Sequence, residues 1–210
     1  MYKLIKAKPS HAEQIVPYLD ITCYWKEFTE GNSLKQSHED FMLEWIVMPR
    51  IPLATVLVQE DNEDVIFGCI ITGTTDDFAE MPDYTPYVHP RVLEVFAPWF
   101  QFSVSDGVIV ELLAVAKELR GQGYGSKLYH VAEELAKKEH RDCISGFIWA
   151  CFPDSLINAI KKGRMVTACI KFADPIKIPL LYLEKKPEYT AMKDYFQSEV
   201  YINTKNMLLD

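Results

Sequence analysis

The sequence has few of the residues that mark fibrous or disordered chains. Of its 210 residues only 9 are glycine and 12 are proline, while 49% are apolar. Collagen-like, low-complexity and disordered chains have a glycine and proline excess, or too little apolar surface to offset chain entropy. The composition therefore predicts a globular protein, and we expect residues 1–210 to form a single domain.

Cysteine is also scarce. The five cysteines are scattered, with no C-x-x-C pair and no histidine at zinc-ligand spacing. We therefore expect no metal site and no disulfide framework. Scattered thiols are typical of a reducing compartment, so we expect a cytoplasmic protein.

Positive charge is in deficit, and long apolar runs are missing. Lys and Arg number 22 against 30 Asp and Glu, a net charge of -8. No general basic field is available for a phosphate backbone, so we expect no nucleic-acid partner; a cationic molecule or basic peptide suits the charge better. The longest apolar runs, residues 51–58 and 108–116, fall short of the roughly 20 residues that cross a bilayer. No signal peptide is visible, and we expect no membrane association.

Apolar periodicity and turn residues predict a mixed order of strands and helices. Residues 73–106 break the pattern and are predicted to be an irregular, acidic and aromatic insertion, and residues 187–210 a packed C-terminal extension. The predicted strands are 2–7, 53–59, 65–72, 108–116, 143–151, 166–172 and 179–185, and the predicted helices are 10–23, 37–48, 126–138 and 154–163.

A glycine-rich turn joins the strand at 108–116 to the helix at 126–138. Gly121, Gly123 and Gly125 permit positive φ angles and bring bare N–H groups close to a ligand. The helix that follows adds unpaired N–H groups and a positive dipole end, which favours a phosphate or pyrophosphate. P-loop spacing is absent, and a Rossmann turn would need glycine where Ser126 stands. The alternative is a turn that only connects the two elements.

The segment resembles the cofactor-binding motif of the GNAT superfamily of N-acetyltransferases, R/Q-x-x-G-x-G/A. Arg120, Gly123 and Gly125 match it, after a strand that reads Leu113-Ala-Val115. The sequence similarity covers roughly residues 108–138, while the element order extends the resemblance across most of the chain. It implies an α/β (α+β) fold: a mixed, mostly antiparallel central sheet with splayed central strands and helices on both faces.

The resemblance also implies that acetyl-CoA is the co-substrate and that no metal is needed. Amides of residues 122–126 would hold the pyrophosphate, the strand edge at 113–115 would bind the pantetheine arm, and Asn158 would touch that arm. The expected cofactor-binding residues are Leu113, Ala114, Val115, Arg120, Gly121, Gln122, Gly123, Tyr124, Gly125, Ser126 and Asn158.

The implied reaction is direct transfer of the acetyl group to a primary amine through a tetrahedral intermediate. Glu111 is the candidate general base, because members of the family often carry a base at this position. Side chains at 111, 113 and 115 are expected to share one strand face, so Glu111 should line the acetyl cleft. The alternative for Glu111 is a structural ion pair with a lysine.

The usual general acid of the family is missing. Many members have a tyrosine four residues before the glycine that ends the short helix, and here that position is Ala159. Ser155 is the candidate replacement donor, with Tyr124, Tyr129 and Cys151 as weaker substitutes. The missing tyrosine also motivates a different function, that of a non-catalytic acyl-CoA-binding sensor.

The acceptor is expected to be a small amine or a peptide, with cationic character. Carboxylates of the insertion at 73–106 would attract it, and Tyr84, Tyr87 or Trp99 would stack on it. The alternative is a solvated acidic loop over an aromatic packing cluster. A homodimer is compatible with the sequence.

Overall fold

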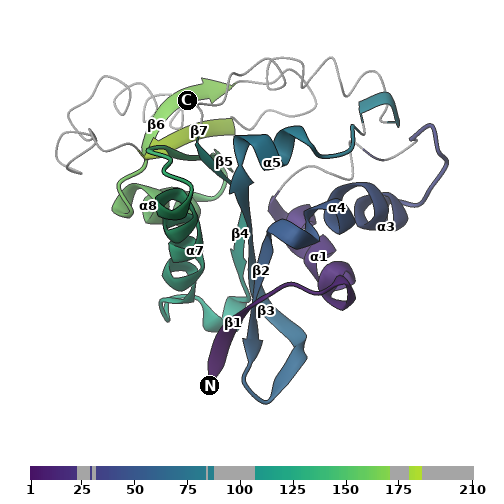
Figure 1. Cartoon of the computed structure of the whole chain (residues 1–210), viewed down its shortest axis with the longest axis horizontal. Helices are drawn as coiled ribbons and strands as arrows, with labels where there is room; N and C mark the ends of the chain where they lie inside the picture. Colours follow the sequence, from purple (N-terminus) through teal and green to yellow (C-terminus); the bar gives the residue numbers. More distant parts are fainter. Residues whose placement is uncertain (23–28, 30–31, 84, 88–106, 171–179, 186–210) are drawn as a thin grey trace.

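The computed structural model describes residues 1–22, 29, 32–83, 85–87, 107–170 and 180–185 (Figure 1). The expected C-terminal extension at 187–210 and most of the expected insertion, residues 84 and 88–106, lie outside these ranges. Within them, no helix is long and apolar enough to cross a membrane.

A seven-stranded sheet in the order β1-β2-β3-β4-β5-β7-β6 forms the centre of the fold. All neighbouring strands are antiparallel except β4 and β5, which are parallel. The mixed, mostly antiparallel sheet expected from the resemblance is confirmed. The strands are β1 (Tyr2–Lys6), β2 (Ala54–Gln59), β3 (Asn62–Thr74), β4 (Val108–Val115), β5 (Ile144–Trp149), β6 (Met165–Ile170) and β7 (Leu180–Lys185).

Helices cover both faces of the sheet, as expected. α7 (Tyr124–Lys138) and α8 (Pro153–Lys161) lie on one face, and α1 (Ala12–Thr22), α3 (His38–Phe41) and α4 (Met48–Arg50) lie on the other (Figure 1). Leu128 and Ala132 of α7 pack on β4 residues in one core, and Ile15 and Leu19 of α1 pack in a second core with Phe41. The 3.6-residue spacing of these apolar side chains explains the packed stripe of each helix.

The helix predicted at 37–48 is present in a modified form. Ser37 caps it, because its side chain accepts a hydrogen bond from the Asp40 N–H. A π-helical segment (Met42–Val47) then connects α3 to α4. Pro49 was expected to end the helix, but it lies inside α4, where its missing N–H falls in the first turn.

The start of the expected irregular insertion is regular. Gly73 and Thr74 belong to β3, and Thr74 caps the short helix α5 (Thr75–Ala79) through a hydrogen bond from the Asp77 N–H. The prediction missed this helix because its apolar residues are few and its acidic residues were assigned to a loop. A 3₁₀ turn (Thr85–Tyr87) follows among the described residues.

Candidate active site

The glycine-rich turn has the backbone that the sequence predicts. Gly121 and Gly123 have φ angles of 77° and 84°, a region that side-chain-bearing residues rarely adopt. Gly123 is the N-cap of α7, so the helix begins at Tyr124. The predicted start at residue 126 was wrong, because the turn closes at Gly123 and Gly125 is already helical.

Four consecutive N–H groups point out of this helix end. Lys127 makes the first helical bond, from its N–H to the Gly123 carbonyl at 3.1 Å, and Gln122 donates to the Leu119 carbonyl at 3.4 Å. Over the described part of the chain, the N–H groups of residues 123–126 donate no hydrogen bond. A Cβ added at Gly121 or Gly123 would meet no atom of the described residues within 4 Å. The turn therefore offers open space lined by free donors, which suits an anion.

Two cationic side chains flank these donors. Arg120 donates from Nε to the Val115 carbonyl at 3.1 Å, which holds its guanidinium at the end of β4. Lys127 lies over the Tyr124 ring, with Nζ 4.9 Å from the ring centroid. Their charges add to the positive end of the helix dipole.

Strands β4 and β5 are paired only at their beginnings. Three residue pairs join them, the last between Val110 and Gly146, and no pair follows in the described sheet. The free part of β4, residues 111–115, runs toward the glycine-rich turn. This is the splay between central strands that the resemblance implies.

Backbone groups of β4 are available on the side that faces β5. The Ala116 N–H donates to the Phe67 carbonyl of β3 at 2.8 Å. In the antiparallel register of β3 and β4, this bond fixes which residues after Glu111 bond to β3, namely every second one. By the alternation of an antiparallel ladder, the N–H groups of Leu113 and Val115 and the carbonyl of Leu113 point the other way, toward β5. An extended ligand could add to this edge as an extra strand.

A β-bulge interrupts β4 at Glu111. Ile71 of β3 is paired with Leu112, but the next residue, Thr72, is paired with Val110. Glu111 is therefore the extra residue. Bulges re-aim side chains and are frequent next to active sites.

The bulge changes the face that Glu111 occupies. Leu113 and Val115 pack in the core beneath α7, whereas the Glu111 carboxylate contacts Arg50 of α4 on the opposite face. The expectation that positions 111, 113 and 115 share one face was wrong, because one inserted residue breaks the two-residue alternation.

Glu111 forms an ion pair with a buried arginine. Arg50 Nε donates to Glu111 Oε2 at 2.7 Å, and the exposed fractions are 6% for the Arg50 side chain and 26% for that of Glu111. Arg50 Nη1 also donates to the Ile46 carbonyl in the π-helical segment. The expected alternative partner was a lysine; the observed partner is an arginine, and no local sequence pattern pointed to it.

The candidate proton donors for the CoA thiolate, and the expected pantetheine contact Asn158, lie on α7, on α8 and in the turn before α8. Ser155 and Asn158 are exposed, whereas Ala159 is buried against β6 and β7. Tyr129 is buried in α7, and within the described ranges its hydroxyl has no hydrogen-bond partner; burial raises its pKa to about 12. Cys151 is exposed, and partial burial of its thiol raises its pKa. Ser155 and Asn158 are thus exposed on α8, whereas Tyr129 is buried in the same core as Val110 of β4.

The described part of the insertion makes aromatic contacts. The Tyr87 ring packs on the Trp45 ring with 4.5 Å between centroids. Tyr84 and Trp99, the other expected stacking residues, lie outside the described residues.

Comparisons with known proteins agree with this geometry. The family model described as the acetyltransferase (GNAT) family matches residues 21–161. The chain belongs to this family. It is therefore an acyltransferase of the GNAT family, as the resemblance implied. The search among curated proteins found no match.

Solved structures share the GNAT fold with low sequence identity. An N-acetyltransferase from Staphylococcus aureus Mu50 is 17% identical, with a TM-score of 0.58 over 87% of this chain and 99% of its own. Another acetyltransferase is 14% identical, with a TM-score of 0.58 over 88% and 98%. A Drosophila melanogaster polyamine N-acetyltransferase is 14% identical, with a TM-score of 0.55 over 89% and 100%.

Proposed function

We propose that this GNAT protein transfers the acetyl group of acetyl-CoA directly to a primary amine of a small molecule or peptide. The observation that carries the proposal is the row of free N–H groups at residues 123–126, at the open end of the β4–β5 separation. These amides, with Arg120 beside them, hold the pyrophosphate.

The pantetheine arm then lies along β4. It hydrogen-bonds the Leu113 carbonyl and the Val115 N–H, which face β5, and this places the thioester near the row where strand pairing ends. The Leu113 N–H serves as donor to the carbonyl oxygen of the tetrahedral intermediate. Such an oxyanion donor contributes roughly 2.7–4 kcal/mol to catalysis.

The acceptor amine approaches from the other face of the sheet, where Glu111 lies. An amine is an ammonium ion at neutral pH and must lose a proton before it attacks. Arg50 engages Glu111 Oε2, so Oε1 is available to accept that proton directly or through one water. The amine nitrogen bonds to the acetyl carbon, and the C–S bond breaks with its electron pair on sulfur. The nitrogen gives its second proton to water, so the amide and CoA form without an acetyl-enzyme.

Structural neighbours suggest which acceptors to test first. They include a polyamine N-acetyltransferase and an arylalkylamine N-acetyltransferase-like protein. The acidic chain, with its net charge of -8, favours such cationic acceptors over acidic ones.

The decisive experiment measures CoA thiol release from acetyl-CoA against a panel of polyamines, arylalkylamines and basic peptides. At least one amine should raise turnover well above hydrolysis, with N-acetylated product seen by mass spectrometry. If CoA binds and no acceptor raises turnover, the chain is instead a non-catalytic acyl-CoA sensor. If calorimetry of the folded protein detects no CoA binding, both functions are ruled out.

A further inference from the structure

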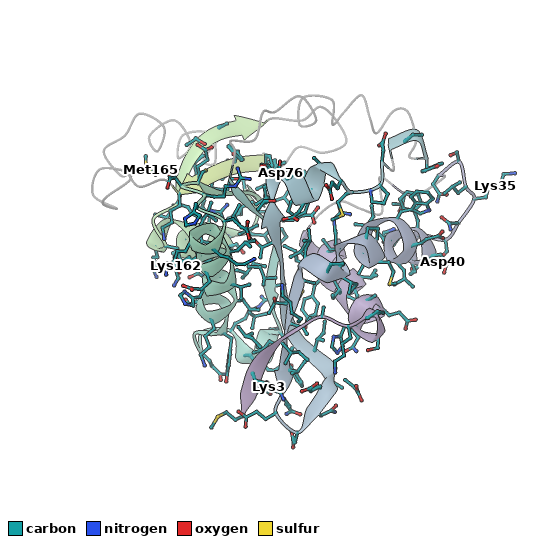
Figure 2. All side chains as sticks on the ribbon, viewed as in Figure 1. Lys3, Lys35, Asp40, Asp76, Lys162 and Met165 are labelled. Carbon is teal, nitrogen blue, oxygen red and sulfur yellow. The ribbon has the colours of Figure 1, made fainter. Side chains whose placement is uncertain are left out.

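A buried arginine follows helix α8 and has few partners. Arg164 is 5% exposed and lies in the turn between α8 and β6, which Lys162 and Met165 flank in Figure 2. Its Nη2 donates to the Leu183 carbonyl at 3.3 Å, and its Nε has no hydrogen-bond partner in the described parts of the chain. Among the described residues Arg164 makes no ion pair. A buried guanidinium without a carboxylate is costly and calls for an explanation.

The guanidinium lies at the row where β4 and β5 part. A Cβ added to Gly146 would be 2.8 Å from Arg164 Nη2 and 2.4 Å from the Val110 carbonyl oxygen. Val110 and Gly146 form the last residue pair between the two strands. Arg164 therefore occupies the closed end of the separation, in the space that the missing side chain of Gly146 leaves.

Arg164 and Glu111 lie on opposite faces at this row. Ile144 and Ile148 pack beneath α7 and α8, and Gly146 between them has the same orientation in the strand. The guanidinium thus lies on the α7 and α8 face, which is also the face of the glycine-rich turn. Glu111 contacts α4 on the other face.

The buried Glu184 accepts a hydrogen bond from the Tyr182 hydroxyl. Among the described residues, no carboxylate forms an ion pair with Arg164. The titratable groups that act on it are Tyr129 of α7, Tyr182 of β7 and Cys143 before β5, and burial lowers its pKa. The Tyr129 hydroxyl is also buried, with no hydrogen-bond partner among the residues that the structure describes. An anion that arrived at this row would offset the desolvation of the guanidinium, because the attraction is strong where water is excluded.

We propose that Arg164 stabilises the thiolate of CoA as it leaves, in place of the missing tyrosine. The inference rests on the proposed function. The amine nitrogen bonds to the acetyl carbon, and the C–S electron pair stays on sulfur beside the guanidinium. The ammonium gives one proton to Glu111 before attack, and the nitrogen gives its second proton to water as the tetrahedral intermediate collapses. The thiolate takes a proton from water after release. Arg164 stays protonated throughout, so no general acid on α8 is needed.

The test follows the thiol of bound CoA directly. The ultraviolet absorbance of the thiolate is titrated for CoA bound to the wild-type protein, to Arg164→Met and to Arg164→Lys, and for free CoA. A nearby cation lowers a thiol pKa. In the wild-type protein the bound thiol should ionise at least about one pH unit lower than in free CoA. Arg164→Met should remove that shift, and Arg164→Lys should keep part of it.

A second ligand separates a role at sulfur from a structural role. Desulfo-CoA has the same nucleotide and pantetheine arm but no thiol, so Arg164→Met should bind it as the wild-type protein does. The kcat for acetyl transfer should fall about 10²-fold in Arg164→Met, the effect of losing one stabilising donor.

Each outcome bears on one proposal. A bound thiol that titrates like free CoA in the wild-type protein overturns the role of Arg164, and this measurement needs no variant to fold. Equal loss of CoA and desulfo-CoA affinity in Arg164→Met also overturns it. Failure of the wild-type protein to bind either ligand would instead contradict the proposed function.

Discussion

Arg50 and Glu111, 61 residues apart in sequence, are joined by a hydrogen bond of 2.7 Å between Nε and Oε2. The contact links helix α4 to the bulge of β4, and the Arg50 side chain is only 6% exposed. The guanidinium is fixed at its other side by the Ile46 carbonyl. One carboxylate oxygen of Glu111 is thus held in place, which orients the other.

Glu111→Gln should lower kcat by about 10²-fold or more, because the amide cannot accept the proton of the acceptor ammonium. The affinity for CoA should stay unchanged, since Glu111 lies on the face opposite the glycine-rich turn. Steady-state kinetics and calorimetry measure the two quantities. An unchanged kcat would remove Glu111 from the mechanism without affecting the cofactor site.

Arg50→Met should lower kcat in the wild-type background and have little further effect when Glu111 is already glutamine. Such non-additivity is expected of two residues that act as a unit. Arg50→Lys should restore part of the rate. Additive losses in the double variant would mean that Arg50 acts only through the packing of α4, and thermal unfolding of each variant would measure that contribution.

Gly123→Trp should abolish CoA binding, because the indole fills the open space in front of the free N–H groups. Gly123→Ala is the matched control. Both variants carry the same strain at φ 84°, which costs about 1 kcal/mol, but alanine adds only one methyl group. Calorimetry should show a much larger loss of affinity for tryptophan than for alanine. Similar losses would indicate that strain in the turn, and not blockage, determines binding.

Gly146→Ala should destabilise the fold by about 1–3 kcal/mol, because its Cβ would clash with the Val110 carbonyl and with Arg164. Gly125→Ala is the matched control, since its Cβ would make ordinary contacts of 3.8 and 3.9 Å within a helix. Thermal denaturation should give a lower Tm for the first variant and an equal or higher Tm for the second. Equal Tm values for Gly146→Ala and the wild-type protein would show that the strands adjust to the added methyl group.

Acid should weaken the contact between the β2–β3 hairpin and the N-terminal segment. Hydrogen bonds from Lys3 and Lys8 lower the pKa of Glu63 from 4.5 to about 2. A lowered folded-state pKa contributes stability above pH 4.5 that is lost as the pH falls toward 2. In Glu63→Gln, the free energy of unfolding should therefore depend less on pH across this window.

The measurement is urea denaturation at several pH values between 2 and 5. Replacing both Lys3 and Lys8 with methionine should flatten the pH dependence in the same way, since the same pairs are lost. A slope that is unchanged in both variants would assign the acid sensitivity to other groups.

Local chemistry was sufficient to predict the backbone of the glycine-rich turn and most of the elements around it. Three glycines in five residues, followed by a helical pattern, allow few backbone paths, and the observed φ angles at Gly121 and Gly123 follow from that restriction. The hairpin of β2 and β3 and strand β4 were likewise predictable, because β-branched runs around turn residues encode their own pairing. The predicted start of α7, residue 126, was only two residues later than the observed start at Tyr124.

The positions of the charged side chains where β4 and β5 separate depend on long-range contacts that no local sequence pattern encodes. The bulge at Glu111 arises from the register of β3 against β4, and it moved this carboxylate to the face opposite the one its spacing suggested. Arg50 ends helix α4 and Arg164 lies in the turn after α8, positions where arginine is ordinary. Only packing shows that both are buried at the row where β4 and β5 separate. A short segment sets φ and ψ within itself, whereas desolvation and counter-ions are set by whatever the rest of the chain places beside it.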